Sequence, residues 1–303
     1  MGEDDESKMN FPMFTMLIGL PGSGKSYYGQ KREKPGTVMI SSDVIRQELF
    51  GNASSQEDNN RVFKEMLVRT LKNLDRGVNV IYDATNVVRK KRKELLTKLP
   101  PYVLKYAVVV WAPITVCIDR DIHRERHVGK DVINKFVKIY QPPFFDEGWD
   151  HINYLINDEN FDVKKFKDEI YSMMYEPHDN PHHTLNILEH CKECERIMST
   201  KQNVSKYLIT AAEYHDCGKP FVKDFHNSKQ EETTIAHYYN HQNVGSYLIP
   251  GLLQGDDLCT VINVSWLVNV HMEPYLETKY YKQLPTFLKK YIDLLHEADV
   301  EAH

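Results

Sequence analysis

Residues 19–26 read GLPGSGKS and match the pattern G-x-x-x-x-G-K-[ST]. Glycines in this pattern let backbone N–H groups turn inward around phosphate oxygens, the lysine places a cation on the outer phosphates, and the last hydroxyl binds Mg²⁺. An apolar run at 13–18 precedes the motif, and the residues after it can open a helix whose N-terminus attracts anions. We therefore expect a site for ATP and Mg²⁺ at Gly22, Ser23, Gly24, Lys25 and Ser26.

Asp43 and Arg46 follow the next apolar run, at 37–40. Ligands of parallel sheets bind beyond the carboxyl ends of the strands, so Asp43 is expected to face the nucleotide. A carboxylate there can accept the proton of an attacking hydroxyl. Arg46, one helical turn further on, can bind an anionic group of the acceptor through two N–H groups. The alternative is that Asp43 only caps a helix and Arg46 lies on the surface.

A third apolar run, at 78–82, ends at Asp83, which resembles the Walker-B acid of nucleotide-binding proteins. Thr85 and Asn86 follow it and are candidates for contacts with phosphate or with the acceptor. The alternative is a helix N-cap at Thr85 or Asn86. The two roles are compatible with each other.

Two basic segments have two interpretations each. Arg120 and Arg124 would lie on one face of a predicted helix at 114–126, where they could neutralise charge on a transferring phosphoryl group or form a solvated face with ion pairs. The run KKRK at 90–93 could guide a nucleic-acid backbone or form a solvated helix face.

Eleven of the 14 histidines lie from His178 onward, which indicates metal chemistry in the second half. Adjacent His215 and Asp216 end an apolar helical pattern and can both reach a metal if other elements bring further ligands. Imidazoles and carboxylates suit Mn, Fe, Co, Ni or Zn. The other ligand candidates are His190, His241, His271 and Asp299.

The whole chain has the composition of a soluble globular protein, with 41% hydrophobic and 27% charged residues over 303 positions. No apolar run approaches the ~20 residues that span a bilayer, and the acidic first residues resemble no targeting peptide. Five cysteines indicate a reducing compartment, so we expect a cytoplasmic protein without membrane contact. Cys191 and Cys194 have zinc-like spacing without a second pair, which favours ordinary helix thiols. The net charge of −5 argues against a general nucleic-acid coat protein.

Strand and helix patterns alternate in the first half, which predicts a parallel sheet with right-handed crossovers. Strands are expected at 13–18, 37–40, 78–82, 104–111 and 151–156, with helices at 57–76, 87–98, 114–126, 131–140 and 162–174. The second half has only helical patterns, at 184–198, 204–217, 233–253, 257–270 and 285–300. The expected organisation is a flexible N-terminus (1–12), an α/β P-loop domain (13–175), a linker (176–183) and an all-α domain (184–303).

The first half resembles the kinase module of phage-type polynucleotide 5′-kinases and their AAA_33-like relatives. The resemblance rests on GLPGSGKS, SSDVIR (41–46), DATN (83–86) and RDIHRER (120–126), in matching order from about 13 to 158, and extends to QPPFFDEGWD (141–150). It implies that Asp43 is the general base for a 5′-hydroxyl and that Arg46 holds the neighbouring phosphate. It further implies that Asp83, Thr85 and Asn86 support the acceptor, while Arg120 and Arg124 touch the ATP phosphates.

The second half resembles the HD superfamily of metal phosphohydrolases, through PHHTLNILEH (181–190), HDCGK (215–219), YNHQNVG (239–245) and EAD (297–299). The resemblance implies one metal held by His190, His215, Asp216 and Asp299. It implies a second metal completed by His241 and His271, with Asp216 as the bridge. Lys219 would bind substrate phosphate. Weaker candidates are His183 and His237 in an outer shell and Asp293 as a rival of Asp299.

Together the two resemblances imply an enzyme that heals nucleic-acid ends by adding a 5′-phosphate and removing a 3′-phosphate or a 2′,3′-cyclic phosphate. Its substrates would be 5′-OH ends of RNA or DNA, an RNA ligase could act in the same pathway, and an oligomer is compatible with the sequence. One alternative is an enzyme of nucleotides or small phosphorylated metabolites, which the acidic net charge favours. Another is a regulatory module that binds NTP without turnover.

Overall fold

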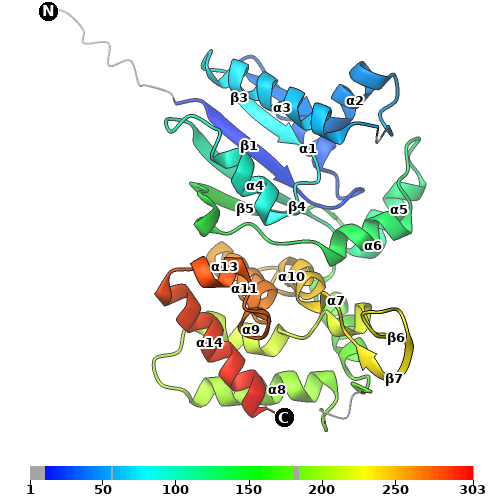
Figure 1. Cartoon of the computed structure of the whole chain (residues 1–303), viewed down its shortest axis with the longest axis vertical. Helices are drawn as coiled ribbons and strands as arrows, with labels where there is room; N and C mark the ends of the chain where they lie inside the picture. Colours follow the sequence, from blue (N-terminus) through cyan, green and yellow to red (C-terminus); the bar gives the residue numbers. More distant parts are fainter. Residues whose placement is uncertain (1–10, 56, 180–183, 303) are drawn as a thin grey trace, which may run out of the picture.

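The computed structural model describes residues 11–55, 57–179 and 184–302. The first half contains a five-stranded sheet in the order β2-β3-β1-β4-β5, and every neighbouring pair is parallel (Figure 1). The strands are β1 (Met13–Ile18), β2 (Thr37–Ser41), β3 (Asn79–Asp83), β4 (Leu104–Trp111) and β5 (His151–Ile156). The prediction of a parallel sheet is confirmed, with each strand within one residue of its expected bounds.

Helices connect these strands and flank the sheet. They are α1 (Lys25–Gln30), α2 (Ser42–Phe50), α3 (Asn59–Leu74), α4 (Arg89–Leu96), α5 (Ile114–Ile122), α6 (Lys130–Lys138), the 3₁₀ turn η1 (Phe145–Glu147) and α7 (Val163–Met174). The β1 strand lies between β3 and β4, so the loops after β1, β2 and β3 meet at one edge of the sheet. That edge is where the predicted phosphate site lies.

The second half is helical, as predicted, with one hairpin in addition. Its elements are α8 (Ile187–Thr200), α9 (Lys206–Tyr214), the 3₁₀ turn η2 (Lys219–Phe221), β6 (Asp224–His226), β7 (Glu232–His237), α10 (His241–Leu252), α11 (Leu258–Val270), α12 (Glu273–Leu276), α13 (Lys279–Gln283) and α14 (Thr286–Glu301). The helix expected at 233–253 starts only at His241. Thr233, Thr234 and Ile235 favour a strand over a helix. Asn240 has a φ of 66°, which is not a helical conformation, so α10 begins only after this residue.

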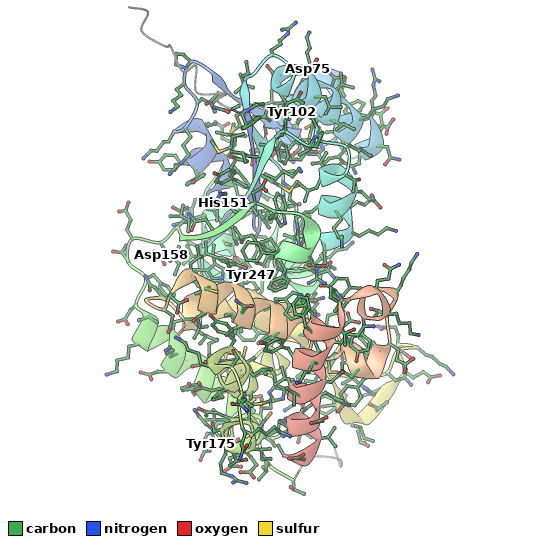
Figure 2. The ribbon with its side chains drawn as sticks, turned by 90° about the vertical axis from the view of Figure 1, so that its left-hand side faces the viewer. Asp75, Tyr102, His151, Asp158, Tyr175 and Tyr247 are labelled. Atoms are coloured by element: carbon green, nitrogen blue, oxygen red, sulfur yellow. The ribbon has the colours of Figure 1, made fainter. Side chains whose placement is uncertain are left out.

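The two halves share one hydrophobic core. Helices α10 and α11 pack against β5 (Figure 1). Tyr247 of α10 lies at this junction (Figure 2), where its backbone oxygen accepts a hydrogen bond of 2.6 Å from Trp111 Nε1 and its hydroxyl donates one of 2.8 Å to the oxygen of Ala112. A Cβ added at Gly251 would lie 2.4 Å from the Trp111 ring, so the glycine lets α10 approach the sheet. The two halves are therefore joined by a continuous hydrophobic core.

Buried charges lie within the first half and at its junction with the second. Arg92 binds Glu147 through two nitrogens, at 2.6 and 2.8 Å, and both side chains are almost fully buried. Arg89 donates a hydrogen bond of 2.9 Å to Asn269 of α11. Arg92 belongs to the run at 90–93, so the prediction that this run is one basic surface is wrong at its third residue. The segment 141–150 thus supports the fold through Glu147.

Some predicted features fall outside the described residues. These are residues 1–10 of the expected N-terminal segment, residues 180–183 of the expected linker, and with them His183. Among the helices in the described ranges, none combines the length and apolar character needed to cross a membrane.

Candidate functional site

The P-loop lies between β1 and α1 and is held by the strands around it. The backbone N–H of Gly19 donates to the Thr85 oxygen at 3.0 Å, and the Asn157 amide donates to the Ser23 oxygen at 2.8 Å. Gly24 has a φ of 93°, and a Cβ there would lie 1.9 Å from Asn157 Nδ2, so only glycine fits beside that amide. Asn157, just after β5, is a supporting residue that no sequence motif indicated.

Lys25 and Ser26 start α1 and lie at the phosphate end of the site. Lys25 is buried, and its Nζ donates to the Leu20 oxygen at 2.7 Å. Burial lowers the pKa of the Lys25 ammonium, although the Asp83 carboxylate opposes this shift. Ser26 Oγ donates to Asp83 Oδ2 at 2.8 Å. A hydroxyl and a carboxylate in contact fit a Mg²⁺ ion, which prefers oxygen ligands.

Thr85 and Asn86 lie in the loop after β3, but they do not cap a helix. Helix α4 begins at Arg89, with Val88 as its N-cap. Asn86 has a φ of 52°, and its amide nitrogen donates to the oxygens of Leu17 and Ala84. The amide group of Asn86 therefore fastens the loop to β1. Contacts of Thr85 and Asn86 with an acceptor stay predictions.

Asp43 and Arg46 face each other in the first turns of α2. Arg46 Nη1 lies 3.0 Å from Asp43 Oδ1, and its Nη2 donates to Asn59 Oδ1 at 2.9 Å. Ser41, not Asp43, caps the helix by accepting the N–H of Asp43. Arg126 binds the other Asp43 oxygen from the loop after α5. Sequence reasoning did not select Arg126, because it lies beyond the arginine pair that was expected to act.

The expected arginine pair does not share a helix face. Helix α5 ends at Ile122, so Arg120 is helical and Arg124 lies in the following loop. The early end has a local cause: the Asp121 carboxylate accepts hydrogen bonds from the N–H groups of Val128 and Gly129 and also binds Arg124. These bonds fold residues 123–129 back onto the end of the helix. The prediction of an i, i+4 pair is therefore wrong in geometry, while contact with ATP phosphates stays a prediction for both residues.

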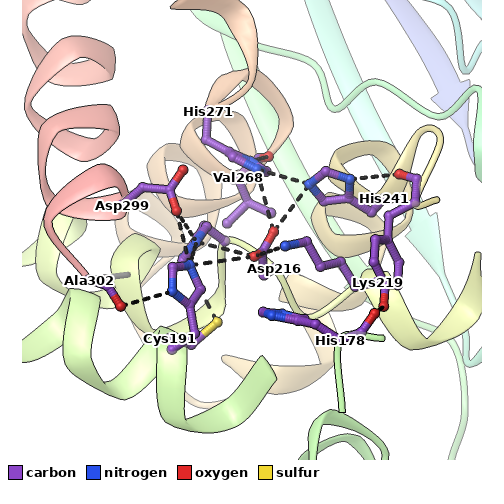
Figure 3. Close-up of polar contacts among 12 residues, drawn as sticks. His178, Cys191, Asp216, Lys219, His241, Val268, His271, Asp299 and Ala302 are labelled. Carbon is purple, nitrogen blue, oxygen red and sulfur yellow. Dashed lines mark hydrogen bonds and ion pairs between the residues drawn. The ribbon is translucent and has the colours of Figure 1, made fainter. Parts of the chain in front are cut away.

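A second cluster forms where α8, α9, α10, α11 and α14 converge (Figure 3). It contains two groups whose ligand atoms lie within 4.8 Å of one another in each group: His190, His215 and Asp299, and Asp216, His241 and His271. All six side chains are buried. Gly218 follows the His215–Asp216 turn, and a Cβ there would lie 2.1 Å from the His241 oxygen. Glycine at 218 thus lets the turn lie against the start of α10.

The imidazole rings of the cluster lie in pairs, and the Nε2 atoms of each pair face each other. His190 Nε2 lies 3.2 Å from His215 Nε2, and His241 Nε2 lies 3.1 Å from His271 Nε2. The Nδ1 atoms of His215, His241 and His271 each lie 2.8 Å from a backbone oxygen. We assign the Nδ1–H tautomer from these bonds, which leaves a lone pair on each Nε2. Converging lone pairs repel one another unless a cation lies between them, so the donor set fits metal ions.

Asp216 lies between the two groups. Its Oδ2 lies 3.5 Å from His215 Nε2 and its Oδ1 lies 3.2 Å from His241 Nε2, so each oxygen faces a different group. Lys219 Nζ lies 2.6 Å from Oδ2. Burial disfavours ionisation of Asp216, but Lys219 and the histidines outweigh it and hold the pKa of the carboxyl well below its usual range. Asp216 is therefore an anion whose two oxygens face the two groups.

The remaining candidates lie outside both groups. Asp293 accepts a hydrogen bond from Tyr281, and His237 stacks on Tyr239. Cys191 and Cys194 are buried free thiols in α8. Tyr275 of α12 was missed: burial, followed by the Asp299 and Asp216 carboxylates, raises the pKa of its hydroxyl to about 12. No sequence pattern indicates this tyrosine. It comes close to Asp299 only because the short helix α12 lies beside α14.

Comparison with known proteins supports the predictions for the first half of the chain more than those for the second half. Residues 14–143 match the AAA_33 family (AAA domain), a match that covers less than half of the chain. It agrees with the predicted P-loop domain, and the helical half lies outside it.

Similar individual proteins match parts of the chain. "Transcription factor bHLH140" of Arabidopsis thaliana is 29% identical over 171 residues, which are 53% of this chain and 17% of that protein. A chain of the Pnkp1/Rnl/Hen1 RNA repair complex is 23% identical, with a TM-score of 0.39, over 44% of this chain and 45% of that one. A gluconokinase from Sinorhizobium meliloti 1021 is 19% identical, with a TM-score of 0.35, over 48% of this chain and 83% of that one. The chain thus spans less than half of the length of the first two.

Proposed function

We propose that this protein heals nucleic-acid ends with two active sites. The first half transfers the γ-phosphate of ATP to a 5′-OH polynucleotide end. The second half hydrolyses a 3′-phosphate or a 2′,3′-cyclic phosphate. The observation that carries the proposal is the placement of Asp216 between two buried ligand groups, in a chain that also holds a P-loop with Ser26 against Asp83. The resulting ends are those that an RNA ligase in the same pathway would join.

In the transfer reaction, the acceptor oxygen attacks the γ-phosphorus and the bond to the departing ADP breaks. Asp43 accepts the hydroxyl proton, and Arg46 positions the acceptor. Lys25, Arg120 and Arg124 stabilise the phosphoryl charge. The P-loop amides of Gly22, Ser23 and Gly24 hold the phosphates, with Ser26 as the Mg²⁺ ligand and Asp83 beside it. Thr85 and Asn86 line the acceptor side.

In the hydrolytic reaction, divalent metals of the Mn, Fe, Co, Ni or Zn type would supply a water nucleophile and a Lewis acid when bound. His190, His215 and Asp299 would hold one metal, His241 and His271 would hold the other, and Asp216 would be a ligand shared by both. Lys219 reaches the same centre and neutralises the substrate phosphate. The burial of all these side chains keeps the ligand set rigid.

The test uses the full chain with ATP labelled at the γ-phosphate, Mg²⁺ and a 5′-OH oligonucleotide that carries a 3′-phosphate. We expect label on the 5′ end and release of unlabelled phosphate from the 3′ end. Asp43→Ala should abolish only labelling, and His271→Ala should abolish only release. Absence of transfer by the wild-type protein would sink the kinase proposal.

A second candidate substrate class is the free nucleotide or a small phosphorylated metabolite. The net charge of −5 favours it, because a polyanionic chain is attracted less by an acidic protein. Comparing a mononucleoside with an oligonucleotide of the same 5′ residue decides between the classes. The oligonucleotide should be the better acceptor under the proposal.

A further inference from the structure

A cavity outside both candidate sites lies where the two halves meet. Its volume is about 520 Å³, which is the size of a small-ligand pocket. Its wall is formed by η1 of the first half and by α9, α11 and α14 of the second, with Tyr207 and Phe287 in the first turns of α9 and α14. His215, His271 and Asp299 lie at or near the opposite ends of these three helices. The cavity is therefore separate from the metal cluster.

Aromatic rings from both halves line this cavity. Phe144 and Trp266 are buried and stack face to face, with ring centroids 4.4 Å apart. Three further rings are open to solvent: Phe145 is 48% exposed, Phe287 is 63% exposed and Tyr291 is 38% exposed. Exposed ring faces on a cavity wall can be covered by a flat aromatic ligand, which gains stacking in addition to burial of apolar area. The cavity thus favours a ring system over an aliphatic chain.

Lysines surround the cavity on three helices. Lys93 of α4 lies 3.5 Å from Asp146, which lines the cavity and is the acidic group of its wall. Lys206 and Lys290 are exposed, and each precedes a lining tyrosine in α9 or α14. Lys206 lies 3.4 Å from Asp257 at the surface, where such a pair is weak. Exposed aromatic rings with lysines beside them are typical of surfaces that bind single-stranded nucleic acid, because bases stack and phosphates attract cations.

One buried side chain connects the cavity with the loop after β3, which is predicted to contact the acceptor. Arg92 Nη1 donates to the Asn86 oxygen at 3.0 Å, and Arg92 Nε donates to Glu147 Oε2 at 2.8 Å. Glu147 ends η1, whose Phe145 and Asp146 line the cavity. The acceptor loop and the cavity wall are therefore held by the same guanidinium. A strand that begins at this loop has only a short way to the cavity.

We propose that the cavity is a pocket for a base of the single-stranded nucleic acid whose 5′ end occupies the kinase site. Phe145 and Phe287 stack on the base, and the exposed lysines of α4, α9 and α14 attract the phosphates on either side of it. The pocket rests on the proposed function for the identity of the strand. It selects a polynucleotide over a free nucleotide, because a nucleotide at the acceptor loop is too short to reach it. The lysines and the connection to the acceptor loop favour this occupant over an apolar protein segment.

The first experiment measures binding to the full chain without ATP. The probes are 5′-OH oligonucleotides that each carry one 2-aminopurine, at successive positions from the 5′ end. We expect a fluorescence change at an interior position, where the base leaves its stacked neighbours and enters the pocket. Phe287→Ala should abolish that change and weaken binding of the oligonucleotide roughly tenfold or more, the size of one lost base–aromatic stack. Phe287→Trp should retain both.

Tyr175→Ala is the matched control, because Tyr175 is an aromatic residue that is 64% exposed at the end of α7 and does not line the cavity. It should bind the oligonucleotide as the wild type does. Equal binding by Phe287→Ala and the wild type, or no interior position with a fluorescence change, overturns the pocket. Those results are also the ones expected if a protein segment occupies the cavity.

Turnover separates the pocket from the proposed reaction. With ATP and Mg²⁺, Phe287→Ala should raise KM for the oligonucleotide roughly tenfold and change KM for a dinucleotide less than about twofold. Transfer to the oligonucleotide with the same KM in both proteins contradicts the pocket and leaves the kinase proposal standing. Binding that depends on Phe287, without any 5′-phosphorylation by the wild type, leaves the pocket standing and contradicts the kinase proposal.

Discussion

The two candidate sites differ in how their polar groups are satisfied. In the P-loop half, opposite charges bind each other: Asp43 contacts two arginines, and Lys25 donates to a backbone oxygen. In the helical half, groups of the same kind converge, with two pairs of Nε2 atoms at 3.1 and 3.2 Å. The first site can hold its shape without a ligand. The second has a donor set that fits metal ions.

Under the proposed function, this difference corresponds to two ways in which a chain prepares for phosphate chemistry. A transferase must admit and release ATP and an acceptor, and its charged residues can bind one another between turnovers. A metal centre keeps its ions, so its ligands are buried and locked by backbone oxygens. Substitutions should therefore affect the two reactions independently, although the halves share one core.

The largest effect is expected for Asp216→Ala. Because each Asp216 oxygen faces a different ligand group, its loss should impair both metals and reduce phosphate release by about a thousandfold or more. Labelling of the 5′ end should stay unchanged. Asp293→Ala is the control, since Asp293 lies outside both groups. Equal losses in the two variants would remove the distinction between the sites.

Lys25→Ala is the converse test, in which the first site should lose its reaction and the second should keep its own. Removal of the cation on the outer phosphates should reduce 5′ labelling by about 10²–10³-fold, as for other donors of an electrostatic site. Phosphate release from the 3′ end should persist, measured with the same oligonucleotide. Loss of both reactions together would indicate that the sites are not independent.

Trp111→Ala tests whether the halves form one cooperative unit. The indole is fully buried between β4 and α10, so its truncation should lower the free energy of unfolding by about 3–5 kcal/mol. Urea unfolding, followed by metal release and by circular dichroism, should show coincident transitions in the wild type. Two separate transitions would mean that each half unfolds on its own.

The smallest effect is expected for Lys90, the first residue of the basic run at 90–93. Lys90 is 83% exposed, and Lys90→Ala should change stability by less than about 0.5 kcal/mol. Arg92→Ala removes the two guanidinium hydrogen bonds of the buried Glu147 and should cost about 3–5 kcal/mol. Thermal denaturation of both variants compares the two positions. Similar losses of stability in the two variants would contradict the claim that Arg92 is buried and paired while Lys90 is exposed.

The sequence predicted the sheet and the two clusters because strand periodicity and ligand types are local properties. The sequence did not predict the features that depend on tertiary contacts. Asp121 ends α5 early by accepting two backbone N–H groups, and no pattern in 114–126 indicates that. Arg126 and Asn157 contribute through loops that only the fold brings to the phosphate site. The hairpin β6–β7 was missed because the helical pattern after it dominated the segment.

The central claim is that Asp216 bridges two metal ions in the helical half. The most direct test is electron paramagnetic resonance of the full chain reconstituted with Mn²⁺, together with metal analysis. We predict two Mn²⁺ per chain and a spin-coupled signal from a bridged pair, which Asp216→Ala abolishes. Fewer than one Mn²⁺ per chain, or two ions with uncoupled signals, would contradict the account.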